Sequence, residues 1–423
     1  MFKIFALVFG CPSNIADYEI ALGLLKGAGF GIAKSQEEAD LNIIFTCVVK
    51  EQTFQKMIFK IKEFTKIKKP LIVAGCMAKN DSKLIERINP NASIITPDNI
   101  EKIVDAVNIA MKGKKVLFIE DSNKPKLNLP RCRKNPFIGI VQISKGCLSN
   151  CSYCYEPYRG KFFSYPLSEI VEEVKSAIES GCKEVWITSL DNGCYGFDIG
   201  LDLADLLNEV CKINEKFFVR VGMMNPLHIK KFLNKLIEAY QNEKIFKFIH
   251  IPVQSGSNKI LKLMRRGYKA RDFIQIVKKF RKKIPLITIS TDIIVGFPYE
   301  SERDFKSTIQ LIEKTKPDMV NISKFGARFG TEAAKMEQLN RKVVNERSSF
   351  LTNLVRKISL ENNEKWVGWE GEIFVDEIGK NNSLVGRNFA YKPVVIKANN
   401  LLGKFVNVEI FDVSSSCLFG KIK

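Results

Sequence analysis

The segment Gly146-Cys-Leu-Ser-Asn-Cys-Ser-Tyr-Cys154 places three cysteines within eight residues, directly after the apolar run 137–143. Three thiolates on one loop are soft ligands. A zinc site requires a fourth ligand, and the nearest histidine, His228, lies far along the chain. A ferredoxin-type run supplies a fourth cysteine at short spacing, and none follows here. The loop therefore indicates a [4Fe–4S] cluster with three anchored irons and one open iron. The alternative is three small buried residues.

The run before this loop is the first of six apolar segments that alternate with helical sequence. This alternation predicts an α/β fold, with a TIM-like (βα)6 barrel over residues 136–358. The cysteine loop then lies at the C-terminal mouth of the barrel, where the chemistry of such barrels is found. Polar residues also follow the other apolar segments, at the same predicted mouth of the barrel. Gly296, which follows one of these segments, would allow the backbone to approach a flat ligand closely. The segments are 137–143, 184–189, 217–222, 246–251, 286–292 and 318–323, and the polar residues include Asp191, Arg220, Asn225, His250, Gln254, Ser255 and Asp292.

A second set of cysteines is dispersed through residues 1–115. Cys11, Cys47 and Cys76 each follow a short apolar run, at 4–9, 43–46 and 71–75, with helical sequence after it. These βα units predict an open parallel sheet, in which ligands bind beyond the carboxyl ends of the strands. Three cysteines at three strand ends can converge, which predicts a metal site. A linker is expected over residues 116–135.

The last part of the chain, residues 359–423, has short strand-like runs separated by Gly and Asn turns. These predict a small all-β barrel of the OB type, a fold that binds nucleic acid. Its net charge is zero, so we expect it to guide RNA by shape and through Trp366 or Trp369, or to serve mainly as a packing module. The runs are 372–375, 384–386, 394–396 and 405–410.

Composition and charge limit the class of protein. The 423 residues carry a formal net charge of +20, of which about +15 lies in residues 116–360. This excess favours a polyanionic partner, although a lysine-rich surface also serves solubility. The chain has eleven cysteines, an odd number that does not suit a framework of disulfide pairs. No apolar run approaches the ~20 residues that span a bilayer. A disulfide framework and a membrane protein are therefore not expected, and we expect a cytoplasmic location.

The loop at residues 146–154 resembles the CxxxCxxC loop of radical S-adenosylmethionine enzymes. Together with the three dispersed N-terminal cysteines, the chain resembles the methylthiotransferases, and within them the archaeal and eukaryotic tRNA branch. The resemblance implies an N-terminal methylthiotransferase domain, a radical barrel and a C-terminal TRAM domain. The stretches similar to that branch are 220–226 (RVGMMNP), 250–257 (HIPVQSGS), 264–268 (MRRGY), 321–324 (NISK) and Gly330-Thr331.

The resemblance also implies an activity: conversion of N6-threonylcarbamoyladenosine at position 37 of tRNA to its 2-methylthio derivative. Cys147, Cys151 and Cys154 then hold the radical-generating cluster, and Cys11, Cys47 and Cys76 hold a second [4Fe–4S] cluster that presents sulfur. Tyr153, Asp191, Gln254, Ser255 and Gly296 are the expected contacts to S-adenosylmethionine. The implied partners are the tRNA anticodon loop, an external electron donor and a sulfur donor.

Some positions depart from the family pattern. The segment between Cys154 and Arg159-Gly160 is one residue shorter, and Leu190 replaces a usual acidic residue. Tyr299 stands in place of a glycine, and Cys194 stands where alanine is common. Two other activities remain open: methylthiolation of a ribosomal protein side chain, and non-catalytic electron transfer by a two-cluster protein that binds RNA.

Overall fold

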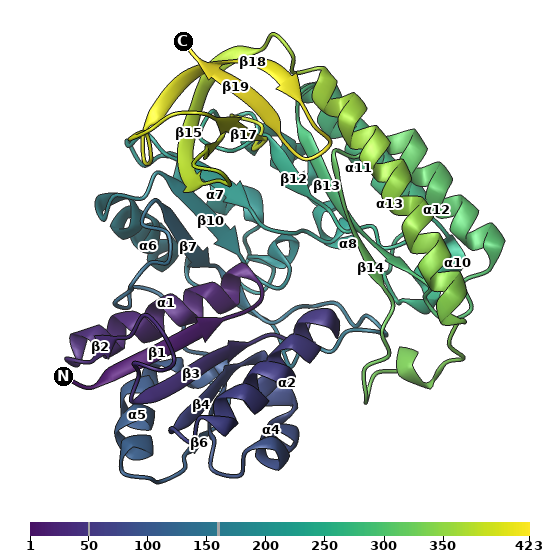
Figure 1. The fold of residues 1–423 in the computed structure, drawn as a ribbon. Coiled ribbons are helices and arrows are strands. Elements are labelled where there is room, and N and C mark those ends of the chain that lie inside the picture. The colour runs from purple at the N-terminus through teal and green to yellow at the C-terminus, as the bar shows by residue number, and fades with distance from the viewer. Residues whose placement is uncertain (50, 159–160) are drawn as a thin grey trace. The chain divides into compact units, whose positions relative to one another are not determined.

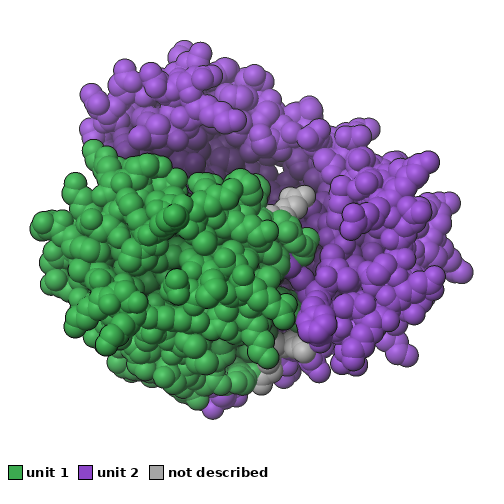
Figure 2. All heavy atoms as spheres, turned by 60° about the horizontal axis from the view of Figure 1, so that its bottom comes forward, with its two compact units in different colours: residues 1–136, 140–146, 154–173 green, residues 137–139, 147–153, 174–423 purple. Residues whose placement is uncertain are grey.

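The computed structural model describes residues 1–49, 51–158 and 161–423, which form two compact units. The first unit contains residues 1–136, 140–146 and 154–173, and the second contains residues 137–139, 147–153 and 174–423 (Figure 2). Each unit has its own core and is described by itself. In the described part of the chain, no helix is long and apolar enough to cross a membrane.

The first unit is built on a six-stranded sheet in the order β2-β1-β3-β4-β5-β6, and all of its strand pairs are parallel (Figure 1). The runs predicted at 4–9, 43–46 and 71–75 are the three neighbouring strands β1, β3 and β4. The sheet is therefore the open parallel sheet that the sequence predicts. Its strands are β1 Lys3–Val8, β2 Gly31–Ile32, β3 Leu41–Thr46, β4 Leu71–Gly75, β5 Ser93–Ile95 and β6 Leu117–Phe118.

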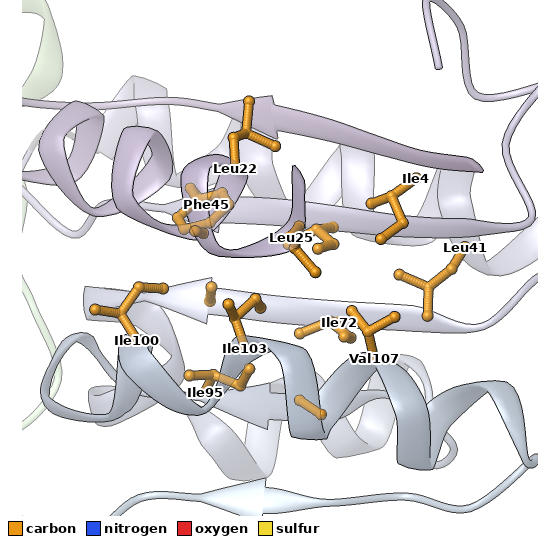
Figure 3. Packing of buried hydrophobic residues seen from close by; sticks show 14 of the residues in the cluster. Ile4, Leu22, Leu25, Leu41, Phe45, Ile72, Ile95, Ile100, Ile103 and Val107 are labelled. Carbon is orange, nitrogen blue, oxygen red and sulfur yellow. The ribbon is translucent and has the colours of Figure 1, made fainter. Parts of the chain in front are cut away.

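Helices cover both faces of this sheet, so its central strands are apolar on both sides. Ile43 and Phe45 of β3 pack in one core, and Ile44 between them packs in the other. Figure 3 shows the first core, in which Ile103 and Val107 of α5 face the sheet. The helices are α1 Pro12–Gly27, α2 Glu51–Lys66, α3 Cys76–Asn80, α4 Ser82–Ile88, η1 Pro97–Lys102 and α5 Ile103–Met111; the hairpin β8 Ser144–Lys145 and β9 Phe163–Ser164 also belongs to this unit.

The strands of the predicted barrel form two three-stranded sheets, ordered β11-β10-β7 and β12-β13-β14. A parallel bridge between Val219 and Ile245 connects β11 to the segment before β12. All six predicted strands are present, and the α/β barrel architecture is confirmed in this two-sheet form. The strands are β7 Ile138–Gln142, β10 Glu184–Thr188, β11 Phe218–Val221, β12 Phe248–His250, β13 Thr288–Val295 and β14 Met319–Lys324.

Helices alternate with these strands. The longer helices form because their sequences are amphipathic. Helix α11, for example, buries Phe273, Ile276, Val277 and Phe280 and exposes its lysines. The helices are α6 Leu167–Glu179, α7 Leu203–Cys211, α8 Pro226–Ile229, α9 Leu233–Ala239, α10 Asn258–Leu263, α11 Ala270–Lys283, α12 Glu302–Thr315 and α13 Arg341–Glu364, with the 3-10 turns η2 Asn192–Cys194 and η3 Ala333–Lys335.

The second unit ends in a closed five-stranded barrel ordered β15-β16-β17-β19-β18, as predicted. Trp366 is only 3% exposed and lies in the barrel core, so the expectation that it contacts RNA is wrong; Trp369 packs against it and remains partly exposed. Lys392 donates a 2.8 Å hydrogen bond to Asp318, which ties the barrel to β14. The strands are β15 Glu370–Ile378, β16 Leu384–Arg387, β17 Pro393–Ile396, β18 Phe405–Val413 and β19 Leu418–Ile422.

Candidate metal centres

Cys11, Cys47 and Cys76 lie beyond the carboxyl ends of β1, β3 and β4, which are adjacent in the sheet. Cys11 precedes α1, Cys47 directly follows β3, and Cys76 is the first residue of α3. The thiolate charges of Cys11 and Cys47 each act on Cys76. The first unit thus places the three dispersed cysteines at the ends of three neighbouring parallel strands, on the side of the sheet where ligands bind.

Two glycines make this convergence possible. Gly10 has φ +116°, and a Cβ on it would lie 3.0 Å from Cys47 Sγ and closer still to Cys47 Cβ. Gly75 has φ +94°, and a Cβ there would lie 2.4 Å from the carbonyl oxygen of Thr46. Each glycine precedes a cysteine of the trio. A side chain at Gly10 would therefore displace Cys47, and one at Gly75 would displace the backbone directly before Cys47.

The chemistry of the trio fits a soft metal group. Burial raises the pKa of Cys11 to about 12, and it also raises the pKa of Cys47 and of Cys76. The charge of Glu156 raises all three values further, and neighbouring thiolates raise those of Cys11 and Cys76. A bound metal cation would stabilise the thiolate form of such thiols, and three thiolates would suit three irons of a [4Fe–4S] cluster.

The residues after Cys154 pack beside this trio within the first unit. Tyr155 donates a 2.9 Å hydrogen bond from its hydroxyl to Asp81, and Asn80 donates to the Tyr155 carbonyl. Glu156 lies close enough to raise the pKa of all three thiols. The sequence analysis did not identify Tyr155 or Glu156, because only their position next to Cys154 sets them apart. Arg159 and Gly160, which end the shortened segment, lie outside the described residues.

The other cysteine loop is shared between the units: Cys147 and Cys151 belong to the second unit and Cys154 to the first. The Ser149 N–H donates to Cys147 Sγ at 3.3 Å. A hydrogen bond from the Cys194 thiol lowers the pKa of Cys147 to about 7. This lowered pKa favours the thiolate of Cys147, which is the state that binds metal.

Cys151 receives a hydrogen bond from Arg266, whose Nη1 lies 3.2 Å from its Sγ. Arg266 also donates to the Tyr268 hydroxyl at 3.0 Å and to the Pro252 carbonyl at 3.2 Å. It is only 4% exposed. Arg266 therefore does not belong to the lysine-rich surface that the positive charge of residues 116–360 suggests. It places a buried positive charge directly beside a candidate metal ligand.

Asp191 is fully engaged in organising the loop after β10. Its Oδ1 accepts hydrogen bonds from the N–H groups of Gly193 and Asn225, both at 3.0 Å. Its Oδ2 lies 2.9 Å from Nδ1 of His228, and that nitrogen lies 3.0 Å from Cys194 Sγ. Ligand atoms of Cys147, Asp191 and Cys194 lie within 4.8 Å of one another. The buried side chain of His228 thus lies beside a candidate metal site formed by Cys147, Asp191 and Cys194.

The other predicted cofactor contacts lie in the second unit. Tyr153 packs edge-on against Phe297, with ring centroids 6.2 Å apart. Gln254 has φ +70° and pairs with Ile293 by a β-bridge, and Ser255 is fully buried beside Thr308. Gly296 has φ +74°, and a Cβ there would lie 2.4 Å from the side chain of Val344. Both this backbone conformation and the close packing of α13 therefore require a glycine here.

Comparison with known families assigns each part of the chain. Residues 141–312 match the radical SAM superfamily, residues 3–96 match "Uncharacterized protein family UPF0004", and residues 364–423 match the TRAM domain. A radical S-adenosylmethionine methyltransferase, TsrM, from Kitasatospora setae has a similar fold, with a TM-score of 0.55 and 13% identity over 76% of this chain and 73% of its own. The fold and the three-cysteine loop define a radical S-adenosylmethionine protein.

Full-length relatives narrow this class. "Probable threonylcarbamoyladenosine tRNA methylthiotransferase" from Pyrococcus abyssi is 42% identical over 100% of both chains, and the protein of the same name from Archaeoglobus fulgidus is 40% identical over 98% of this chain and 97% of its own. "Threonylcarbamoyladenosine tRNA methylthiotransferase" from Drosophila melanogaster is 36% identical over 99% of this chain and 77% of its own. The chain belongs to the threonylcarbamoyladenosine tRNA methylthiotransferase family.

Proposed function

We propose that this protein converts N6-threonylcarbamoyladenosine at position 37 of tRNA to 2-methylthio-N6-threonylcarbamoyladenosine. The observation that carries the proposal is the buried thiol trio of the first unit. A radical S-adenosylmethionine enzyme that only removes a hydrogen atom needs one set of three cysteines. Insertion of sulfur needs a second centre that supplies sulfur, and Cys11, Cys47 and Cys76 provide three soft ligands for it.

The bound groups supply the difficult chemistry: with S-adenosylmethionine and one electron, a [4Fe–4S] cluster provides a radical that removes hydrogen from an aromatic C–H bond. Cys147, Cys151 and Cys154 are the three ligands for that cluster. Arg266 places positive charge at Cys151, and Cys194 donates a hydrogen bond to Cys147, so both thiolates are stabilised by the chain itself. Tyr153, Asp191, Gln254, Ser255 and Gly296 are the proposed surroundings of S-adenosylmethionine.

The sulfur-donating centre is held by Cys11, Cys47 and Cys76 in the first unit. Cys47 is only 4% exposed, and the two glycine turns allow the backbone to pack closely beside it. The chain then divides into the methylthiotransferase domain at 1–115, a linker at 116–135, the radical domain at 136–358 and the TRAM domain at 359–423. An external electron donor and a sulfur donor complete the reaction, and the cytoplasm is its proposed location.

The RNA partner follows from charge and from the family. The excess positive charge of residues 116–360 suits the phosphates of a tRNA stem, whereas the neutral C-terminal barrel contributes shape. The anticodon loop is single-stranded, so one of its bases can be splayed out at modest cost and presented to the radical domain. We therefore propose the anticodon loop as the docking point.

The test is the nucleoside content of tRNA from cells that lack the protein. Deletion is expected to remove the methylthio derivative while the threonylcarbamoyl nucleoside remains, as measured by mass spectrometry of digested tRNA. Wild-type protein should restore the derivative, a Cys76→Ala variant should not, and a Cys182→Ala variant should match wild type. Unchanged nucleosides, or a mass change on a ribosomal protein instead, would reject the proposal. A nucleic-acid-binding electron carrier would change neither.

A further inference from the structure

Cys194 is a fourth thiol beside the radical-domain cysteines. It ends the turn η2, directly after β10, and it is fully buried. Its Sγ lies within 4.8 Å of Cys147 Sγ, and 3.0 Å from His228 Nδ1. Two thiols this close inside a protein can form a disulfide after a modest movement of their side chains.

Both loops that carry these thiols are anchored to the same residue. Asn225 donates from its side chain to Ser149 Oγ at 3.0 Å, two residues after Cys147. The Asn225 N–H donates to Asp191 at 3.0 Å, three residues before Cys194. The contact between the thiols is therefore fixed by a hydrogen-bonded framework and does not depend on one flexible loop.

We propose that Cys194 is the redox partner of Cys147, and that the two form a disulfide when the radical cluster is lost. Hydrogen peroxide is the oxidant: one thiol attacks a peroxide oxygen to give a sulfenic acid and water, and the second thiol displaces hydroxide as water to form the S–S bond. Two thiol hydrogens and two electrons are thus transferred to peroxide, which becomes two waters. A dithiol reductant reverses the change.

The consequence for the protein rests on the proposed role of Cys147 as an iron ligand. A sulfur bound to a second sulfur cannot bind iron as a thiolate, so the disulfide and the radical cluster exclude each other. The disulfide also stops oxidation at a reversible stage, because a lone sulfenic acid proceeds to sulfinic acid, which is not readily reversed. The pair thus protects an iron ligand while the cluster is absent.

The test uses the full-length protein stripped of iron by a chelator and treated anaerobically with one equivalent of hydrogen peroxide. Free thiols are alkylated, and the digest is analysed by mass spectrometry without reduction. We expect the peptide with Cys147 to be linked to the peptide with Cys194, and two thiols to be lost. Linkage of Cys147 to Cys151 or Cys154 instead, or sulfinic acid at Cys147 without a link, overturns the inference.

Variants add a second readout. Wild-type protein after peroxide treatment is expected to regain only about half of its iron, roughly four atoms of eight, until a dithiol is added. Cys194→Ser should form no link and, when given a second equivalent of peroxide, should accumulate sulfinic acid at Cys147, whereas Cys182→Ser, which removes another buried thiol, should behave as wild type. Full iron recovery by the oxidised wild type without a dithiol would refute the proposed exclusion.

Failure of this inference is distinguishable from failure of the proposed function. If untreated Cys147→Ser binds as much iron as wild type, the assignment of Cys147 as a ligand is wrong, whatever the disulfide does. If Cys147→Ser loses iron and the wild type forms no link to Cys194, the ligand assignment stands and the redox pairing is wrong.

Discussion

Arg266 is the residue through which the protein most directly acts on the proposed radical cluster. Its guanidinium is buried and donates to Cys151 Sγ at 3.2 Å. A hydrogen bond to a charged group contributes about 1.5–3 kcal/mol. The reduced cluster carries one more negative charge than the oxidised cluster, so the reduced state gains more from this contact. Replacement by methionine, which has similar length and no charge, should therefore lower the reduction potential.

The size of the shift follows from that difference. If removal of Arg266 weakens the reduced state by about 1.4 kcal/mol relative to the oxidised state, the one-electron potential falls by about 59 mV. The assay is an EPR-monitored redox titration of protein that also carries Cys47→Ala, so that one cluster is observed. Arg266→Lys keeps the charge but loses the forked geometry, and it should give a smaller shift.

The neighbouring Arg265 supplies a matched control. It is exposed and pairs with Glu332, so Arg265→Met should leave the potential within error of wild type. An unchanged potential in Arg266→Met, or an equal shift in both variants, would refute the role assigned to Arg266. Cluster content is measured beside the potential, because loss of the buried guanidinium also destabilises the fold.

Three further outcomes are expected. Cys47→Ala should bind about half the iron of wild type, roughly four atoms per chain, whereas Cys211→Ala should bind the full amount, as measured by iron analysis after anaerobic reconstitution. Burial and the charge of Asp376 raise the pKa of Glu184 to about 7. This folded-state pKa lies above the unfolded value. The stability that neutral Glu184 contributes is therefore present below about pH 4.5 and is lost as the pH rises through 7. In a denaturant titration at pH 8, Glu184→Gln should therefore have a free energy of unfolding higher than that of wild type by up to about 3 kcal/mol, with the difference vanishing near pH 4. Affinity for tRNA should fall linearly on a plot of log K against log salt, and a flat plot would contradict phosphate binding by the basic middle region.

Much of the fold is predictable from the sequence because its strands are continuous apolar runs. The run predicted at 71–75 coincides with β4, and the runs at 184–189 and 318–323 match β10 and β14 within one residue. The strands that the sequence analysis did not identify are short edge strands such as β2 and β6, together with β19. Their two to five residues become strands because a neighbouring strand pairs with them, and no local pattern encodes that pairing.

The candidate sites were less predictable than the fold. The thiol trios could be located because cysteine is a distinctive ligand and parallel strands end at one edge. Arg266 could not, because its contact with Cys151 spans 115 positions of the chain and arginine near lysines resembles a solvated face. Trp366 was misjudged for a similar reason: an aromatic residue can fill a small barrel as readily as it can stack on a base.

The central claim is that the second thiol trio makes this protein a sulfur-inserting enzyme for modified tRNA. The most direct measurement incubates the anaerobically reconstituted protein with S-adenosylmethionine, a reductant and tRNA that carries N6-threonylcarbamoyladenosine, and then identifies the nucleosides by mass spectrometry. Wild-type protein is expected to yield the methylthio derivative on this tRNA and none on tRNA with plain adenosine at position 37, and Cys47→Ala is expected to yield none. Formation of the derivative by Cys47→Ala, or no sulfur transfer by wild-type protein that carries both clusters, would contradict the account.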